Sequence, residues 1–336
     1  MASGRTPVVL VAGFLGSGKT TLLNHLLATA GGTRIGVVVN DFGSINIDAM
    51  SVAGQVDSMV SLSNGCLCCA VDSSGLDAML SKLAQADVDV IVVESSGLAD
   101  PRELIRMLLG SAEPGISYGG LVEVVDAAEF DATRARHPEF AQHLQYADVV
   151  VLNKTDRVAE LGELRASLAE HAPGTPVLET SQGRVDPDFL FDRAQRPVRD
   201  DIPRQLSFSD IVEHDNCHEH AHSAYQSVEF SSEQPMDPRA LAAFLDDLPA
   251  GLYRIKGNVH FGIPGYRERF VLHAVGNYVR FLRTPWSAGE PRRTSLVLIG
   301  TGIDEAALHN GLAECRTGAP EEADEYAMLP VLRFTA

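Results

Sequence analysis

A glycine-rich segment lies between an apolar run and a helical pattern near the start of this chain. Residues 13–20 read GFLGSGKT and fit the pattern G-x-x-x-x-G-K-[ST]. An apolar run at 7–12 precedes the segment, and leucines recur at helical spacing from Leu22 to Leu27 after it. Glycines allow a tight loop whose N–H groups face phosphate oxygens, and the amino end of a helix favours an anion. The pattern therefore predicts a strand, a phosphate-binding loop and a helix.

Two residues of this loop carry the expected chemistry. The ammonium of Lys19 can neutralise the β- and γ-phosphates of a nucleotide, and the Thr20 hydroxyl can bind Mg²⁺. We therefore also expect Lys19 to be catalytic. The residues predicted to bind nucleotide in this segment are Gly13, Gly16, Ser17, Gly18, Lys19, Thr20 and Thr21.

Valine-rich apolar runs alternate with helical patterns over the first part of the chain. Runs of this kind, without polar alternation, are typical of strands buried on both faces of a parallel sheet. The predicted fold class is therefore α/β, a P-loop NTPase domain with a mostly parallel sheet. We expect strands at 7–12, 35–39, 88–93, 121–125 and 149–152, and helices at 22–30, 76–83, 101–109 and 159–171.

The chain has 336 residues, which at about 150 residues per domain predicts roughly two domains. We expect the P-loop domain over 1–192, a histidine-containing linker over 193–223 and a smaller α+β domain over 224–336. In this last domain we expect strands at 224–230, 252–257, 270–275, 279–283 and 296–299, and helices at 238–247 and 304–313.

The charge balance excludes some partners. The chain has 27 basic and 45 acidic residues, a net charge of −18. Sequence-independent binding to nucleic acid or anionic lipid needs the opposite sign, so we expect neither a nucleic-acid nor a membrane partner. The apolar run at 7–12 is too short for a signal peptide, and no run is long enough for a transmembrane helix. The expected location is the cytoplasm.

A second motif predicts which base is bound. Residues 153–156 read NKTD and follow the apolar run at 149–152. The carboxylate of Asp156 can accept hydrogen bonds from guanine N1–H and the exocyclic amine, a pair that adenine does not offer. Asn153, Lys154 and Asp156 therefore favour GTP over ATP as the ligand.

Carboxylates follow several of the expected strands. Glu94 ends the run at 88–93, where a P-loop protein orients Mg²⁺ or water, so Glu94 is a candidate for both Mg²⁺ binding and catalysis. Asp41 and Asp48 lie in a loop after the second strand, where a switch that senses the γ-phosphate is expected, and Asp41 is a further catalytic candidate. Asp126 ends another strand. Each of these carboxylates could instead cap a turn or face solvent.

Three of the five cysteines form one cluster. Cys66, Cys68 and Cys69 stand in a C-x-C-C pattern, and no disulfide framework has this spacing. Three thiolates suit Zn²⁺, Co²⁺ or Cu⁺. No fourth ligand is obvious nearby, and an open position suits an ion that arrives and leaves. Asp41, Asp48, water or a partner's ligand could complete the site.

Histidines gather in the expected linker. An alternating histidine pattern can bind a transition ion, but a solvated polar linker has the same composition. Both interpretations stay open, and the residues are candidates for an accessory metal site. They are His214, His218, His220 and His222, with Cys217 among them.

Together, the segments at 13–20, 66–69, 94–101 and 153–156 resemble the CobW-type family of P-loop GTPases. These are metallochaperones and metal-insertion GTPases related to the urease and hydrogenase nickel accessory GTPases. The resemblance implies that Cys66, Cys68 and Cys69 bind the metal and that 224–318 is the family's C-terminal domain. One departure is Asp41, because the family has Asn-Glu-Phe-Gly where this chain has NDFG at 40–43.

The combined hypothesis is a GTPase that couples Mg²⁺·GTP to the binding of Zn²⁺ and its delivery to a client metalloprotein. GTP would order the loop at 40–48 and bring the thiolates together. One alternative is a cobalt-handling factor in cobalamin synthesis, because thiolates accept Co²⁺ as well. Another is a passive zinc buffer in which the nucleotide is structural. A small-molecule kinase is disfavoured, because it leaves the NKTD segment unexplained.

Overall fold

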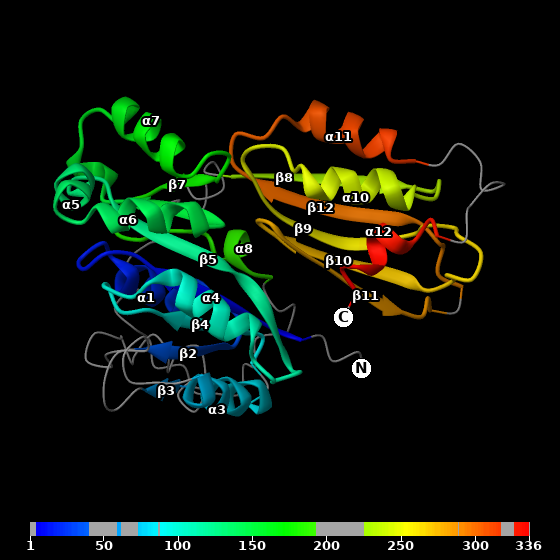
Figure 1. Cartoon of the computed structure of the whole chain (residues 1–336), viewed down its shortest axis with the longest axis horizontal. Helices are drawn as coiled ribbons and strands as arrows, with labels where there is room; N and C mark the ends of the chain where they lie inside the picture. The colour runs from blue at the N-terminus through cyan, green and yellow to red at the C-terminus, as the bar shows by residue number, and fades with distance from the viewer. Residues whose placement is uncertain are drawn as a thin grey trace, which may run out of the picture. The chain divides into compact units, whose positions relative to one another are not determined.

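The computed structural model describes residues 5–39, 59–61, 73–86, 88–192, 225–287, 289–316 and 326–335 (Figure 1). The chain divides into two compact units. The first comprises Met1–Ala172 and Leu178–Ala224, and the second comprises Pro173–Val177 and Tyr225–Ala336. The predicted domain boundaries at 192 and 224 stay predictions, and the expected linker at 193–223 lies outside the described residues.

A sheet of seven described strands forms the centre of the first unit, in the order β3-β2-β4-β1-β5-β6-β7. The pairs β1–β4, β1–β5, β2–β3, β2–β4 and β5–β6 are all parallel. Every residue of β2, β4 and β6 is buried, which explains why these strands read as uninterrupted apolar runs. The strands are β1 (Thr6–Ala12), β2 (Ile35–Val39), β3 (Met59–Ser61), β4 (Val90–Glu94), β5 (Ile116–Asp126), β6 (Val149–Asn153) and β7 (Val177–Glu179).

Helices connect these strands and cover the sheet. One core cluster joins leucines of α3 and α4 to residues of β1, β4 and β5. Helix α4 begins where its sequence predicts, because Asp100 caps the N–H of Arg102 at 2.9 Å and Pro101 occupies the first turn. The helices are α1 (Lys19–Thr29), α3 (Ser73–Gln85), α4 (Pro101–Leu109), α5 (Phe130–Arg136), α6 (Pro138–His143), η3 (Leu144–Tyr146), η4 (Thr155–Arg157), α7 (Gly162–His171) and α8 (Pro187–Leu190).

The second unit is built on an antiparallel sheet of five described strands, in the order β11-β10-β9-β12-β8. Alternate residues of the strands share one core with the described helices α10, α11 and α12. Those helices therefore cover a single face of this sheet. The elements are β8 (Gln226–Ser232), α10 (Pro238–Asp246), β9 (Leu252–Val259), β10 (Arg269–Val275), β11 (Tyr278–Thr284), β12 (Thr294–Gly300), α11 (Glu305–Glu314) and α12 (Leu329–Leu332).

These two architectures confirm the predicted fold class, a mostly parallel α/β domain and a smaller α+β domain. Among the described residues, no helix has both the length and the apolar character that spanning a bilayer requires.

Candidate nucleotide-binding site

The loop between β1 and α1 depends on glycine at two closely packed positions. Gly13 has a φ of +140°, and a Cβ there would lie 2.3 Å from the carbonyl oxygen of Val124. Gly18 has a φ of +107°, and its Cβ would lie 2.2 Å from Nδ2 of Asn153. L-residues rarely adopt such backbone angles, and neither position has room for a side chain. The glycines of the motif are therefore required by the packing of the loop onto the sheet.

Lys19 folds back into this loop. Its side chain is buried, and Nζ donates hydrogen bonds to the carbonyl oxygens of Gly13 at 2.8 Å and Phe14 at 3.2 Å. Burial lowers the pKa of the Lys19 ammonium, while the carboxyl groups of Glu94 and Glu123 act to raise it. The ammonium thus contacts two backbone carbonyl oxygens, and a phosphate oxygen could replace either of them.

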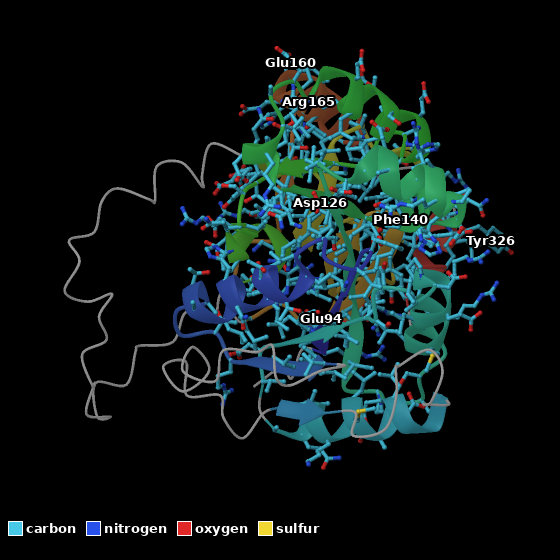
Figure 2. All side chains as sticks on the ribbon, turned by 90° about the vertical axis from the view of Figure 1, so that its left-hand side faces the viewer. Glu94, Asp126, Phe140, Glu160, Arg165 and Tyr326 are labelled. Carbon is cyan, nitrogen blue, oxygen red and sulfur yellow. The ribbon has the colours of Figure 1, made fainter. Side chains whose placement is uncertain are left out.

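Thr20 and Glu94 meet beside the loop. Thr20 lies in the first turn of α1 and donates from Oγ1 to Oε1 of Glu94 at 2.7 Å. Glu94 is the last residue of β4, and its side chain is largely buried (Figure 2). A hydroxyl and a carboxylate are hard oxygen donors of the kind that Mg²⁺ prefers, so this pair fits the ion. Thr21, also predicted to bind nucleotide, is exposed on the same helix turn.

The NKTD segment lies against the phosphate loop. Asn153 donates from Nδ2 to the carbonyl oxygen of Ser17 at 2.9 Å and accepts the N–H of Gly183 at Oδ1, also at 2.9 Å. Lys154 has a left-handed φ of 61° and donates from Nζ to the carbonyl oxygen of Gly16 at 2.7 Å. The structure thus brings two motifs together that are far apart in the sequence.

Asp156 and Ser17 differ in their surroundings. Asp156 lies in η4 and is exposed, so it is accessible to a ligand. Ser17 is almost completely buried, and among the described residues its Oγ has no hydrogen-bond partner. An unsatisfied hydroxyl within a phosphate loop suits a loop that awaits a polar ligand.

Asp126 and Glu123, both on β5, add to this site. Asp126 accepts a hydrogen bond from Lys154 Nζ at 2.6 Å and lines a cavity of about 240 Å³ beside the loop, together with Phe14, Gly16 and Phe140. Figure 2 labels Asp126 and Phe140. The position of Asp126 at a strand end was visible in the sequence. Glu123 was not anticipated, because it lies inside the apolar run at 121–125. Its only signal is a single carboxyl in the otherwise apolar run at 121–125.

Several predicted site residues lie outside the described residues. These are the switch carboxylates, the thiol cluster and the linker residues, namely Asp41, Asp48, Cys66, Cys68, Cys69, His214, Cys217, His218, His220 and His222. Their roles stay predictions. Within the described part of the chain, no group of three or more His, Cys, Asp or Glu side chains could hold a metal ion.

A parallel sheet, a glycine-rich loop at the end of β1 and a buried lysine inside that loop define a nucleotide-binding protein of the P-loop class. Residues 7–179 match the model of the CobW/HypB/UreG nucleotide-binding domain, and residues 225–316 match that of the cobalamin synthesis protein cobW C-terminal domain. The chain belongs to this CobW/HypB/UreG family.

Two relatives and one solved structure match more than nine-tenths of the chain. A protein named "Zinc chaperone CobW" from Sinorhizobium is 31% identical, and the match covers 91% of this chain and 96% of the relative. A protein of the same name from Pseudomonas aeruginosa is 32% identical, with 92% and 91% covered. The structure of Zn(II)-bound YjiA GTPase from E. coli aligns at 22% identity and a TM-score of 0.45, covering 94% of this chain and all of YjiA.

Proposed function

We propose that this chain is a GTP-dependent metallochaperone that binds Zn²⁺ and delivers it to a client metalloprotein. The observation that carries the proposal is the contact of Thr20 with Glu94 at 2.7 Å beside the buried Lys19. Hard oxygen donors next to a cation support the binding of a Mg²⁺·nucleotide. The choice of zinc is supported by relatives named zinc chaperones, whose matches cover more than nine-tenths of the chain.

The residues of the phosphate loop have separate roles in this proposal. The backbone N–H groups of residues 13–18 bind phosphate oxygens, and Lys19 neutralises the charge that develops on the terminal phosphate. Thr20 and Glu94 would hold Mg²⁺, which withdraws charge from the same phosphate. Asp41 is the further catalytic candidate that the sequence predicts.

Guanine selectivity rests on the NKTD segment in this proposal. Lys154 packs onto the loop through its bond to Gly16, and Asp156 is exposed beside it. The carboxylate of Asp156 accepts from guanine N1–H and from the exocyclic amine. GTP is therefore the proposed substrate, and hydrolysis to GDP and phosphate is the proposed reaction.

Zinc is the cargo in this proposal, and the thiolates of Cys66, Cys68 and Cys69 bind it. The histidines at 214, 218, 220 and 222 are accessory ligands. Delivery requires that the nucleotide state changes zinc affinity, because a ligand shifts an equilibrium only through differential binding. A tenfold change corresponds to about 1.4 kcal/mol of coupling free energy.

The test is zinc affinity measured by competition with a chromophoric chelator. The protein is titrated without nucleotide, with Mg²⁺ and a non-hydrolysable GTP analogue, and with Mg²⁺·GDP. A variant with Cys66, Cys68 and Cys69 all changed to Ser removes the proposed ligands. Cys315→Ala is the matched control, because Cys315 is a buried thiol in the second unit.

We expect the GTP analogue to tighten zinc binding at least tenfold relative to GDP, the triple variant to lose it, and Cys315→Ala to behave like the wild type. Zinc affinity that is independent of nucleotide would instead favour a passive zinc buffer. The same titration with Co²⁺ tests the cobalt alternative, which predicts that the nucleotide changes Co²⁺ affinity but not Zn²⁺ affinity.

A further inference from the structure

Glu123 is a buried carboxyl directly beneath the phosphate loop. It lies on β5, where it pairs with Ala12 of β1, the residue before Gly13, and on the other side with Val150 of β6. Its side chain is 1% exposed. Among the described residues, Oε2 of Glu123 has no hydrogen-bond partner. A buried carboxyl in this state is costly when ionised, so its presence in a strand needs a reason.

Few charged groups surround Glu123 in the described part of the chain. Strands β1 and β6 contribute no charged side chain, and the buried residues of α4 are Pro101, Leu104 and Leu108. On β5 itself, Asp126 is paired with Lys154. Among the residues that the structure describes, the ionic group that acts on Glu123 is Lys19, the same ammonium that we assign to the phosphates.

Burial and Lys19 oppose each other at this carboxyl. Burial raises the pKa of Glu123 to about 8, and the attraction of Lys19 only partly offsets this rise. At neutral pH the group is therefore mostly a neutral acid, and the charge of Lys19 is not neutralised by it. In alkaline solution the carboxylate forms and competes for that charge.

We propose that Glu123 is a positioning residue for Lys19: as a neutral acid it leaves the ammonium available to phosphate, and as a carboxylate it draws the ammonium toward the sheet. This inference rests on the proposed function, because it takes the nucleotide phosphates as the ligand of Lys19. The phosphates also repel a carboxylate at Glu123. Nucleotide binding and protonation of Glu123 therefore favour each other, and by linkage the complex takes up a proton as it forms.

The experiment is the Kd of a non-hydrolysable GTP analogue with Mg²⁺ at pH 7.0 and pH 8.5, for the wild type and Glu123→Gln. With a pKa of about 8 in the free protein, we expect wild-type binding to weaken about three- to fourfold over this range. Glu123→Gln keeps the shape of the neutral acid, so it should match the wild type within about twofold at pH 7.0 and lose the additional weakening at pH 8.5. Alkaline effects on the guanine ring or on Lys19 are common to both proteins.

Asp148→Asn is the matched control for loss of a buried carboxyl. Asp148 is largely buried, but it precedes β6 at the edge of the sheet opposite the phosphate loop, so this variant should keep the wild-type pH dependence. If Glu123→Gln does not fold, calorimetry of the wild type at pH 8.0 in two buffers of different ionisation enthalpy replaces it. We expect uptake of up to about half a proton per nucleotide bound.

The outcomes separate this inference from the proposed function. If Glu123→Gln binds the analogue with the same pH dependence as the wild type, the inference about Glu123 is wrong. It is also wrong if the wild type takes up no proton on binding. Either result leaves the proposed function intact. If the wild type does not bind the GTP analogue at either pH, both the proposed function and this inference fail.

Discussion

The side chain of Lys19 has two sets of partners, backbone carbonyl oxygens and carboxyl groups. Its ammonium donates to the carbonyl oxygens of Gly13 and Phe14, and two carboxyl groups, those of Glu94 and Glu123, act on it. A buried ammonium with this environment is stabilised by neighbours that an anionic ligand can replace. The residue therefore links the folding of the loop to the binding of phosphate.

Lys19→Met tests this role. Methionine keeps the aliphatic bulk but loses the charge and the hydrogen bonds to Gly13 and Phe14, so we expect the free energy of unfolding to fall by about 1–3 kcal/mol. We expect the Kd of the GTP analogue to rise about ten- to a hundredfold, because a hydrogen bond to a charged group contributes about 1.5–3 kcal/mol. Lys82→Met, which removes an exposed lysine of α3, is the control and should bind like the wild type. Equal affinity in both variants would show that Lys19 is not a phosphate ligand.

Asp156→Asn tests the base assignment. An amide in place of the carboxylate cannot accept from both guanine groups, so we expect weaker GTP binding and tighter binding of xanthosine triphosphate. Competition between the two nucleotides for a fluorescent analogue measures the change. Glu160→Gln removes an exposed carboxylate from the same part of the chain and serves as the control (Figure 2). Unchanged selectivity in Asp156→Asn would contradict the guanine assignment.

The individual elements show which sequence signals predict structure. Strands β2, β4 and β6 were predictable because burial on both faces favours apolar residues, and only the last residues of β4 and β6, Glu94 and Asn153, are polar. The first half of β5 was not, since its residues 117–120 read SYGG and its ladder with β1 is irregular between Val8 and Leu10. Strands β3 and β7 have three residues each and are too short to show a pattern.

The sequence predicts those parts of the site that depend on local motifs, but not those that depend on how distant segments pack. The phosphate loop and the NKTD segment were predictable, because specific residue types are needed at fixed spacing. Glu123 could not be predicted, because the run at 121–125 still has the pattern of a buried strand when one of its residues is a carboxylic acid. The contact of Asn153 with Ser17 depends on how β6 is placed beside the loop, which only the three-dimensional structure shows.

Gly13→Ala tests the packing of the loop onto β5. The Cβ would lie 2.3 Å from the carbonyl oxygen of Val124 at a φ of +140°, so we expect a loss of about 2 kcal/mol or more in the free energy of unfolding. Gly16→Ala is the matched control. Its φ is +78°, but a Cβ there meets no atom within 4 Å, so we expect a loss of about 1 kcal/mol. Urea titration without nucleotide measures both, and equal losses would contradict the packing argument.

Asp148 connects β5 to β6, and its raised pKa makes the free energy of unfolding depend on pH. It accepts hydrogen bonds from the Tyr118 hydroxyl and, at 2.8 Å, from the N–H of Leu121. Burial raises its pKa from 3.8 to about 6, and these bonds offset part of the rise. The folded state therefore binds a proton more tightly than the unfolded state. The stabilisation is fully present below about pH 4 and is lost as the pH rises to about 6.

Comparison of the wild type with Asp148→Asn isolates this contribution. We expect the unfolding free energy of the wild type, relative to the variant, to fall between pH 4 and pH 6 with a slope of at most about 1.4 kcal/mol per pH unit. Above about pH 6.5 the difference should be constant. Urea titrations at several pH values measure it, and a difference that rises with pH would give Asp148 the opposite sign.

The whole molecule combines a nucleotide-binding unit with an antiparallel unit whose described helices cover one face of its sheet. Residues 7–179 and 225–316 match two separate family models, the CobW/HypB/UreG nucleotide-binding domain and the cobW C-terminal domain. The two-unit organisation was predictable from the change in hydrophobic pattern along the chain. The thiol cluster and the linker histidines were chosen from sequence alone, and their ligand roles stay predictions.

The central claim is that nucleotide and zinc binding are coupled in one molecule. The most direct test is the reciprocal titration, the Kd of the GTP analogue with and without saturating Zn²⁺. Thermodynamic linkage requires zinc to tighten the analogue by the same factor by which the analogue tightens zinc, which we expect to be at least about tenfold. Mg²⁺·GDP should show a smaller factor. Equal affinities for the analogue with and without zinc would show that the two sites are independent and would contradict the proposed coupling.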